Sequence, residues 1–472
     1  MPTIFKPQIS FLVNVLAASA ALAASDGLKS PMIDGPLHDQ VVTDSKDVKR
    51  HAWRQNRNRM VAAQPGLQED PTSIIIQFKE HDLPEWEETL RAMFDSVVIE
   101  SWSNMPNLQH VTVSGDSRHA ARVIEQIGQA LGIVEFAEPD VFYQLGATPN
   151  DPYYSTLWAL NNSGQTVNKD RGTNNADIDA NLAWDVATGS TSMVVGMADS
   201  GIRKTHEDLA ANIWTNPGEI AGNGIDDDGN GYKDDTWGWD FWNNDADPSD
   251  DNGHGSHTAG TVGAVGNNGK GITGVCWNVR LAALKIGSAN GSVSVSAAIS
   301  AINYCVGKGI KVSNHSWGGG TFSSAMDTAI TNAKNAGHLM VCSAGNSGLS
   351  NETSPSYPAS YSQDNILSVA ATDNDDRLAS FSNYGATRVD LGAPGVNIRS
   401  CYKTTNTTYS YLSGTSMAAP QVTGVAALVW SQNPTWSYTQ VRSKILSSVK
   451  PLSTLSGKTV SGGLLNANNA VR

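Results

Sequence analysis

Apolar residues follow two different patterns along the chain, and the pattern changes near residue 147. Between residues 72 and 146, short runs typical of strands alternate with two segments whose apolar residues recur at helical spacing. Their βαββαβ order predicts a small α+β domain in which two helices cover one sheet. The expected elements are, in order, the strand Ser73–Lys79, the helix Pro84–Phe94, the strands Val97–Trp102 and Leu108–Val113, the helix Ser117–Leu131 and the strand Ile133–Leu145.

After residue 147 the chain becomes rich in Gly, Asn, Ser and Ala, and continuous apolar runs alternate with helical patterns. Continuous runs are typical of strands buried on both faces of a parallel sheet. The pattern predicts an α/β fold with a doubly wound, mostly parallel sheet, whose functional residues gather at the carboxyl ends of the strands. The expected strands are Met193–Met197, Arg280–Ile286, Ile310–Asn314, Leu339–Ser343 and Ile366–Ala370, with helices at Val295–Val306 and Ser324–Ala336.

The N-terminal region has the pattern of a secreted protein. Residues 1–24 combine Lys6 with an apolar run and the small-residue pattern Ala21-Leu22-Ala23, which together predict a signal peptide. Residues 25–71 are polar and irregular and are expected to form a spacer. No other stretch reaches the ~18 apolar residues of a membrane span, so we expect a soluble, extracellular mature protein that does not enter a membrane.

Export would permit disulfide bonds, and the four cysteines allow three full pairings. No CxxC pair is present, which argues against a zinc site. Cys342 lies in an apolar run and could equally be a buried free thiol. The cysteines are Cys276, Cys305, Cys342 and Cys401.

The formal net charge of −13 over 472 residues argues against a nucleic-acid-binding protein, which would carry basic clusters. Nothing in the sequence demands more than a monomer. N-glycosylation sequons predict a glycoprotein, although Asn314 ends a predicted buried strand and is the least suited to carry a glycan. The sequons begin at Asn161, Asn290, Asn314, Asn351 and Asn406.

Four polar residues stand where predicted strands end or a helix begins. Asp199 closes the first buried run, Asn346 follows another, His254 lies in a glycine-rich stretch, and Ser416 precedes a small apolar helix-like run. Each alone has an ordinary structural explanation, such as a helix cap for Ser416 or a loop cap for Asp199. Together their chemistry is complementary.

The hydroxyl of Ser416 becomes a nucleophile only when a base removes its proton, and the imidazole of His254 titrates in the range where it can do so. Asp199 would hold the imidazole in the required tautomer and stabilise its charged form. The amide of Asn346 and the backbone N–H of Ser416 would donate to an oxyanion. The four side chains therefore predict acyl transfer.

The order Asp, His, Ser and the motifs ADSGI, NGHGSHTAG, SAGNSG and GTSMAAP resemble the subtilisin-like serine proteases, or subtilases. The resemblance extends over about residues 148–470, including the closing stretch SGGLLNANNAV. It implies a secreted serine endopeptidase that cleaves protein or peptide substrates through an acyl-enzyme, with Asp199, His254 and Ser416 as the triad and Asn346 in the oxyanion hole. A catalytically inactive relative that acts as a binding module is the alternative, whereas a serine esterase of the α/β-hydrolase type fails on chain order and lacks the GxSxG motif.

The same resemblance implies a zymogen. Residues 72–146 would form a ferredoxin-like inhibitory propeptide domain, with residues 25–71 as its spacer. This propeptide would be the chain's own intramolecular inhibitor until self-cleavage near Gly146, and residues 147–472 would form the catalytic domain.

By the resemblance, two extended segments line the cleft and pair with the substrate backbone. Ser356 would lie at the bottom of the main specificity pocket, where the lack of an acid favours apolar or broad preference. Trp317 would shape an outer apolar subsite, or simply pack on its neighbours. The expected substrate-binding residues are Ser316, Trp317, Gly318, Ser343, Ala344, Gly345 and Ser356.

An acidic loop, residues 223–239, predicts a calcium site. Its ligands alternate before Gly231 in a spacing that resembles the first half of an EF-hand, but the twelfth position is Trp237 rather than Glu, so Asp234 or Asp235 would complete the shell. Carboxylates so close together repel unless a cation lies among them, which favours Ca²⁺ over a solvated loop. The candidate ligands are Asp226, Asp228, Asn230, the Tyr232 carbonyl and Asp235.

Relatives imply a second calcium site. It would combine the side chains of Asp151, Asp208 and Asn268 with the carbonyls of Val265, Lys270 and Ile272.

Overall fold

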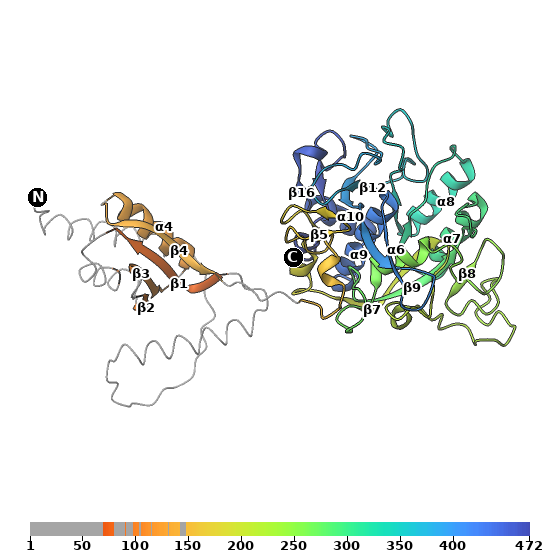
Figure 1. The fold of residues 1–472 in the computed structure, drawn as a ribbon, viewed down its shortest axis with the longest axis horizontal. Coiled ribbons are helices and arrows are strands. Elements are labelled where there is room, and N and C mark those ends of the chain that lie inside the picture. Colours follow the sequence, from red (N-terminus) through yellow and green to blue (C-terminus); the bar gives the residue numbers. More distant parts are fainter. Residues whose placement is uncertain are drawn as a thin grey trace, which may run out of the picture. The chain divides into compact units, whose positions relative to one another are not determined.

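Two separate units make up the chain, residues 1–144 and residues 145–472 (Figure 1). The computed structural model describes residues 69–79, 90, 98–102, 105–114, 116–130, 132–141 and 148–472. The expected signal peptide, nearly all of the spacer, and the helix Pro84–Phe94 except Leu90 lie outside the described residues.

The first unit contains a four-stranded antiparallel sheet in the order β2-β3-β1-β4. Its elements are β1 (Glu69–Phe78), β2 (Val98–Trp102), β3 (Met105–Thr112), α4 (Ser117–Ala130) and β4 (Val134–Val141). Ile74 and Ile76 of β1 pack against Ala120 and Ile124 of α4, which fixes the helix on the sheet. The four predicted strands and the second predicted helix are therefore confirmed in their predicted order.

The second unit is built on a nine-stranded sheet in the order β16-β17-β13-β12-β11-β10-β7-β9-β8. All neighbouring pairs are parallel except β16 with β17. Its strands are β7 (Gly189–Asp199), β8 (Gly238–Asp240), β9 (Asn278–Lys285), β10 (Val312–His315), β11 (Leu339–Ser343), β12 (Ile366–Thr372), β13 (Leu391–Pro394), β16 (Lys450–Pro451) and β17 (Gly463–Leu464). Smaller pairs are β5 (Thr166–Val167) with β6 (Asp170–Arg171), and β14 (Ile398–Cys401) with β15 (Tyr409–Leu412).

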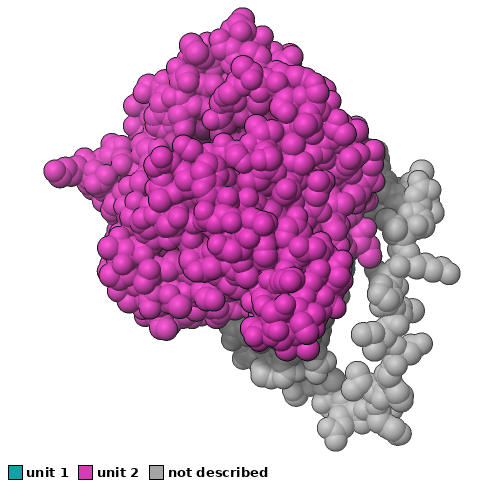
Figure 2. Space-filling model, turned by 90° about the vertical axis from the view of Figure 1, so that its right-hand side faces the viewer, with its two compact units in different colours: residues 1–144 teal, residues 145–472 magenta. Residues whose placement is uncertain are grey.

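Helices cover both faces of this sheet (Figure 1). Because side chains alternate along a strand, Val341 of β11 packs in the core beneath α9, while its neighbours Met340 and Cys342 pack in the core beneath α7 and α8. The helices are α5 (Ala180–Ala183), α6 (His254–Gly263), α7 (Val295–Gly307), α8 (Ser324–Asn335), α9 (Thr415–Gln432), α10 (Tyr438–Ser447) and α11 (Ala467–Val471). The doubly wound fold predicted from the apolar runs is confirmed, and Figure 2 shows the unit as one closely packed body.

Strand order positions the functional residues. The chain places β8 and β9 on one side of β7 and then β10 to β13 on its other side, so the order reverses between β7 and β10. In sheets of this kind, ligands bind outside the carboxyl ends of the strands at such a reversal. Asp199 is the last residue of β7, and Ser316 follows β10.

The predicted disulfide bonds are wrong. All four cysteines lie in the described part of the chain, and all four are free and buried. Burial raises the pKa of the Cys276 thiol to about 12, which keeps it protonated and unreactive. The alternative of a buried free thiol at Cys342 is the one that the structure supports.

Two further sequence features can be compared with the structure. The side chains of Asn314 and Asn351 are fully buried, so these two sequons are inaccessible in the folded protein. Within the described residues, every helix is too short or too polar to cross a membrane.

Candidate active site

The end of β7 and the start of α6 bring a carboxylate and an imidazole together. His254 Nδ1 lies 2.8 Å from Asp199 Oδ1. The buried Asp199 carboxylate also accepts hydrogen bonds from the Ser200 N–H (2.8 Å) and the Thr258 hydroxyl (3.1 Å), which fix its orientation. Gly253, just before His254, has a φ of 108°, and a Cβ there would lie 2.6 Å from the Tyr402 ring, so this turn requires glycine.

His254 is tuned by two carboxylates. Burial lowers its pKa, but the charge of Asp199, the hydrogen bond to Asp199 and the charge of Asp250 together outweigh burial and raise the pKa above its ordinary value. The His254 side chain is 31% exposed, so its ring still reaches the cleft. This is the arrangement that a general base needs, with one ring nitrogen held by a carboxylate and the other able to take up a proton.

Ser416 is the second residue of α9, and Asn346 lies close to the start of this helix. The Asn346 side-chain oxygen accepts hydrogen bonds from the Thr415 backbone N–H (2.8 Å) and the Thr415 hydroxyl (2.9 Å). Because these two donors hold the amide oxygen, the amide NH₂ remains the available donor of this cleft-lining side chain. The Ser316 hydroxyl donates to the Ser416 carbonyl at 2.8 Å and joins the helix start to the segment after β10.

One cleft of about 440 Å³ brings the four predicted catalytic residues together with three of the predicted substrate-binding residues, Ser316, Trp317 and Gly318. Asp199 is the only acidic residue that lines it in the described part of the chain. The sequence did not predict the cleft-lining residues that come from the glycine-rich stretch after β9, from the start of α7 and from Tyr357. Those lining residues are Gly287, Gly291, Val293, Val295 and Tyr357.

The other predicted pocket residues lie behind this surface. Ser343 and Ala344 are buried at the end of β11, and Ser356 is 7% exposed. A Cβ at Gly318 or at Gly345 would lie 3.1 Å from the Ser356 hydroxyl, so Ser356 stands between the two segments expected to bind substrate.

The acidic loop holds its carboxylates close together. Oxygens of Asp228, Asp235 and Glu219 lie within 4.8 Å of one another, and Glu219 was not predicted. Asp226 accepts hydrogen bonds from the Asn230 N–H (3.0 Å) and the Gly231 N–H (2.7 Å), while the Asn230 side chain accepts one from the Tyr232 N–H (2.7 Å).

A lysine enters the same cluster. The Lys308 ammonium contacts Asp228 and lies 3.6 Å from Asp235. Asp235 itself is fully buried and accepts hydrogen bonds from Asn216, Asn230 and Tyr304. The ammonium of Lys308 therefore balances part of the negative charge of this loop.

The second group of predicted ligands meets at Asn268. Asp151 Oδ1 accepts the Asn268 N–H (3.4 Å), and Asp208 Oδ1 accepts the Asn268 side-chain NH₂ (3.0 Å). Burial raises the pKa of Asp151, and the nearby negative charge of Asp208 adds to that rise. Within the described residues, neither carboxylate forms an ion pair with Lys or Arg, whereas Lys308 pairs with the acidic loop. Val265, Lys270 and Ile272 belong to the same loop, and the Ile272 N–H donates to Asp208 (2.8 Å).

Known proteins resemble this chain. The family model Peptidase_S8, described as the subtilase family, matches residues 190–466, a range that contains Asp199, His254, Asn346 and Ser416. A thermophilic serine proteinase from Bacillus sp. (strain AK1) is 36% identical over 351 residues, 74% of this chain and 76% of that protein. Thermitase from Thermoactinomyces vulgaris is 37% identical over 325 residues, 69% of this chain and 99% of that protein. Among solved structures, a protease from Pseudoalteromonas arctica PAMC 21717 has a TM-score of 0.56 at 28% identity and covers 69% of this chain and 99% of that one.

Proposed function

The chain belongs to the subtilase family and is a serine endopeptidase, and from this premise we propose that Asp199, His254 and Ser416 form its catalytic triad. The observation that carries the proposal is the 2.8 Å contact between His254 Nδ1 and Asp199 Oδ1 at a cleft that Ser416 also lines. Asp199 holds the imidazole so that its Nε2 can accept the Ser416 proton.

Catalysis then needs a site for the negative charge on the attacked carbonyl. The Ser416 oxygen attacks, its proton moves to His254, and the carbonyl oxygen becomes an oxyanion that accepts hydrogen bonds from the Asn346 NH₂ and the Ser416 backbone N–H. His254 next gives its proton to the leaving amine, and an acyl-enzyme remains on Ser416. Water activated by His254 hydrolyses that ester.

We propose apolar or broad specificity. The cleft wall is formed by Trp317, Val293, Val295 and Tyr357 together with glycines, and Asp199 is the only carboxylate among the described lining residues. A substrate Lys or Arg would therefore find no free acid in the pocket. The segments 316–318 and 343–345 would bind the substrate backbone as added strands.

We propose structural calcium at two places. Asp151, Asp208 and Asn268, with carbonyls of Val265, Lys270 and Ile272, would hold one ion. Asp226, Asp228, Asn230, Tyr232 and Asp235, with Glu219, would hold another. Each ion would balance carboxylates that otherwise repel one another and would fix the loop that carries them.

We further propose that the enzyme is secreted as a zymogen. Residues 1–24 would direct export, and residues 25–146 would be removed by self-cleavage after the domain that begins at residue 72 has inhibited the cleft. Support comes from the signal pattern and from the separate α+β unit that precedes the catalytic unit.

The test uses the full chain and two variants. Wild type, Ser416→Ala and the control Ser413→Ala are expressed with and without calcium and followed by intact mass and by fluorophosphonate labelling. We expect wild type and Ser413→Ala to shorten near residue 146 and to take one label, whereas Ser416→Ala stays full length and unlabelled. Labelling of Ser416→Ala would overturn the assigned nucleophile. Equal shortening of all three chains would assign the cleavage to another protease.

A further inference from the structure

We propose that Asp250 is a positioning residue that fixes His254 against Asp199, an inference that rests on the proposed triad. Asp250 lies four residues before His254, in the segment that joins β8 to α6. Helix α6 has no side-chain cap at Gly253, the residue before its first turn. Some other group must therefore satisfy the N–H groups at this helix start.

Asp250 supplies that group with both carboxylate oxygens. Its Oδ1 accepts the N–H groups of Asn252 (3.0 Å) and Gly253 (2.8 Å), which lead into His254. Its Oδ2 accepts the Ser256 N–H (2.9 Å) and the Ser256 hydroxyl (2.6 Å), inside the first turn. One carboxylate thus holds the chain on both sides of His254, and its negative charge also suits a helix N-terminus.

Ser200 joins this carboxylate to the strand that carries Asp199. The Ser200 hydroxyl donates to Asp250 Oδ1 (2.9 Å) and accepts the Gly255 N–H (2.9 Å). The hydroxyl of Ser200, the residue after Asp199, therefore binds the backbone of Gly255, the residue after His254. A displacement of Asp250 would change the separation of the two triad members.

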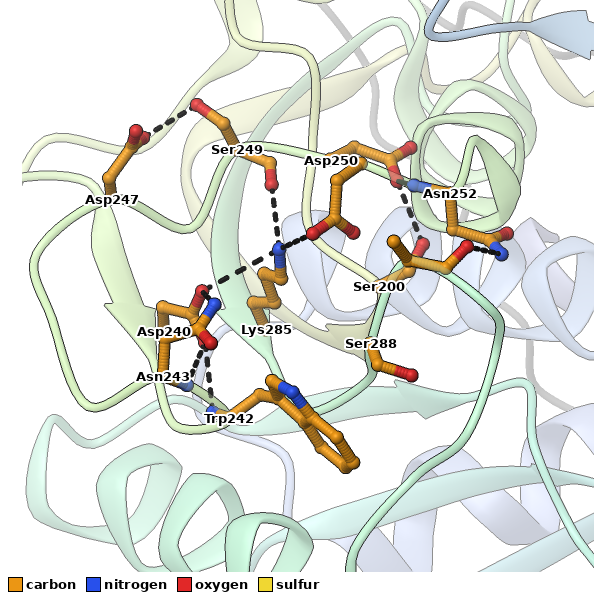
Figure 3. Close-up of polar contacts among 12 residues, drawn as sticks. Ser200, Asp240, Trp242, Asn243, Asp247, Ser249, Asp250, Asn252, Lys285 and Ser288 are labelled. Carbon is orange, nitrogen blue, oxygen red and sulfur yellow. Dashed lines mark hydrogen bonds and ion pairs between the residues drawn. The ribbon is translucent and has the colours of Figure 1, made fainter.

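A buried lysine holds the chain on either side of Asp250 (Figure 3). Lys285, the last residue of β9, is 3% exposed and is paired in register with Asp199 of β7 on one side and Asp240 of β8 on the other. Its ammonium donates to the Ser249 carbonyl (3.3 Å) and to Asp251 Oδ2 (2.6 Å), the residues on either side of Asp250. It also lies 3.6 Å from Asp240 Oδ2.

The charge of Asp250 gives the role a measurable signature. The titratable groups that act on His254 are Asp199 from β7, Asp250 from the segment before α6, and His257 one turn along α6, whose own pKa burial lowers to about 3 so that it stays neutral. Both carboxylates raise the pKa of His254. Removal of the Asp250 charge must therefore lower that pKa and move the acid limb of kcat/KM to lower pH.

The experiment compares Asp250→Asn and Ser200→Ala with the control Asp247→Asn in the full, matured chain. Asp247 lies in the same segment and carries the same charge, and its carboxylate accepts a hydrogen bond from the Ser249 hydroxyl (2.6 Å). Fluorophosphonate titration gives the active fraction of each preparation. We expect Asp250→Asn to lower kcat about 10-fold or more with KM little changed, because a misplaced base costs rate rather than binding. Its acid limb should move to lower pH, because the Asp250 charge no longer raises the pKa of His254.

Ser200→Ala keeps the Asp250 charge, so we expect it to lower kcat without moving the acid limb. Asp247→Asn should match wild type in both. If Asp250→Asn does not mature, Ser200→Ala carries the test of positioning. The inference is overturned if both variants retain wild-type kcat per titrated site, or if Asp247→Asn shifts the acid limb as much as Asp250→Asn. Failure of wild type to take the label would instead overturn the proposed triad.

Discussion

At the scale of single residues, function depends on side chains that have two polar atoms. A neighbouring residue hydrogen-bonds one of these atoms, and the other is left for the reaction. Asn346 is an example, because Thr415 donates two hydrogen bonds to its amide oxygen and leaves its NH₂ as the donor available at the cleft that Asn346 lines. A free amide could rotate and present its oxygen to the oxyanion. Orientation by a neighbour is therefore part of the site, as it is for His254.

Asn346→Leu tests this residue. Leucine keeps the volume but removes the donor, so kcat should fall by about 10²–10³, as removal of one oxyanion donor does in well-studied relatives, while KM changes little. Thr415→Val should cost only several-fold, since its backbone N–H still holds the amide oxygen and one net hydrogen bond is worth about 1 kcal/mol. Steady-state kinetics on a peptide substrate measures both. A Thr415→Val loss as large as that of Asn346→Leu would show that the hydroxyl does more than orient the amide.

At the scale of elements, the loops around the sheet differ in how their charge is balanced. The acidic loop has Lys308 among its carboxylates, whereas Asp151 and Asp208 accept only neutral donors from the described part of the chain, which include the backbone N–H and the side-chain NH₂ of Asn268. Calcium should therefore contribute more to the loop that follows α6 than to the acidic loop.

Thermal unfolding with excess calcium and with chelator measures that difference. Binding at 100 times Kd stabilises the folded state by about 2.7 kcal/mol, so chelation should lower Tm clearly. Asp208→Asn should remove most of this calcium response. Asp227→Asn, an exposed acid of the acidic loop whose carboxylate bonds the Ile220 N–H, is the matched control and should keep it. An equal response in Asp208→Asn and wild type would place the main calcium site elsewhere.

The sequence predicted those strands and helices whose own pattern of apolar residues is enough to identify them. Met193–Met197 and Leu339–Cys342 have no polar side chain because both faces of the sheet are covered there, and this signal needs no knowledge of the neighbouring strands. Strand β8 was missed, since it has only three residues and follows the acidic loop. In the sequence, Lys285 of the partner strand β9 looks like the polar end of a strand. Only the pairing of β9 with β7 and β8, which places Lys285 beside Asp199 and Asp240, shows why this lysine is buried.

The same division holds in the site. Asp199, His254, Asn346 and Ser416 each lie in a recognisable local motif, so they could be found without coordinates. Glu219 and Asp250 could not, because their importance comes from carboxylates and N–H groups that other segments bring to them.

At the scale of the whole molecule, buried histidines set the response to acid. Burial lowers the pKa of His257 and His315 to about 3 and that of His338 to about 4. The Ser313 hydroxyl lies 2.7 Å from Nε2 of both His315 and His338, so these two rings share one partner in the core. Asp177 has the opposite effect on the pH dependence of stability, since burial raises its pKa to about 6.

Stability should therefore fall as pH decreases. A histidine whose folded pKa is lowered contributes full stability above about pH 6.5, where the unfolded chain is also neutral, and loses about 1.4 kcal/mol per pH unit below it until the folded pKa is reached. Three such residues give a slope of up to about 4 kcal/mol per unit, reduced between about pH 6 and 4 as Asp177 takes up its proton. Urea unfolding of Ser416→Ala, which is not expected to digest itself, measures the profile by tryptophan fluorescence. Addition of His338→Gln, whose amide can still bond Ser313, should make the slope shallower by one histidine's share, and an unchanged slope between pH 6 and 4 would refute the assignment.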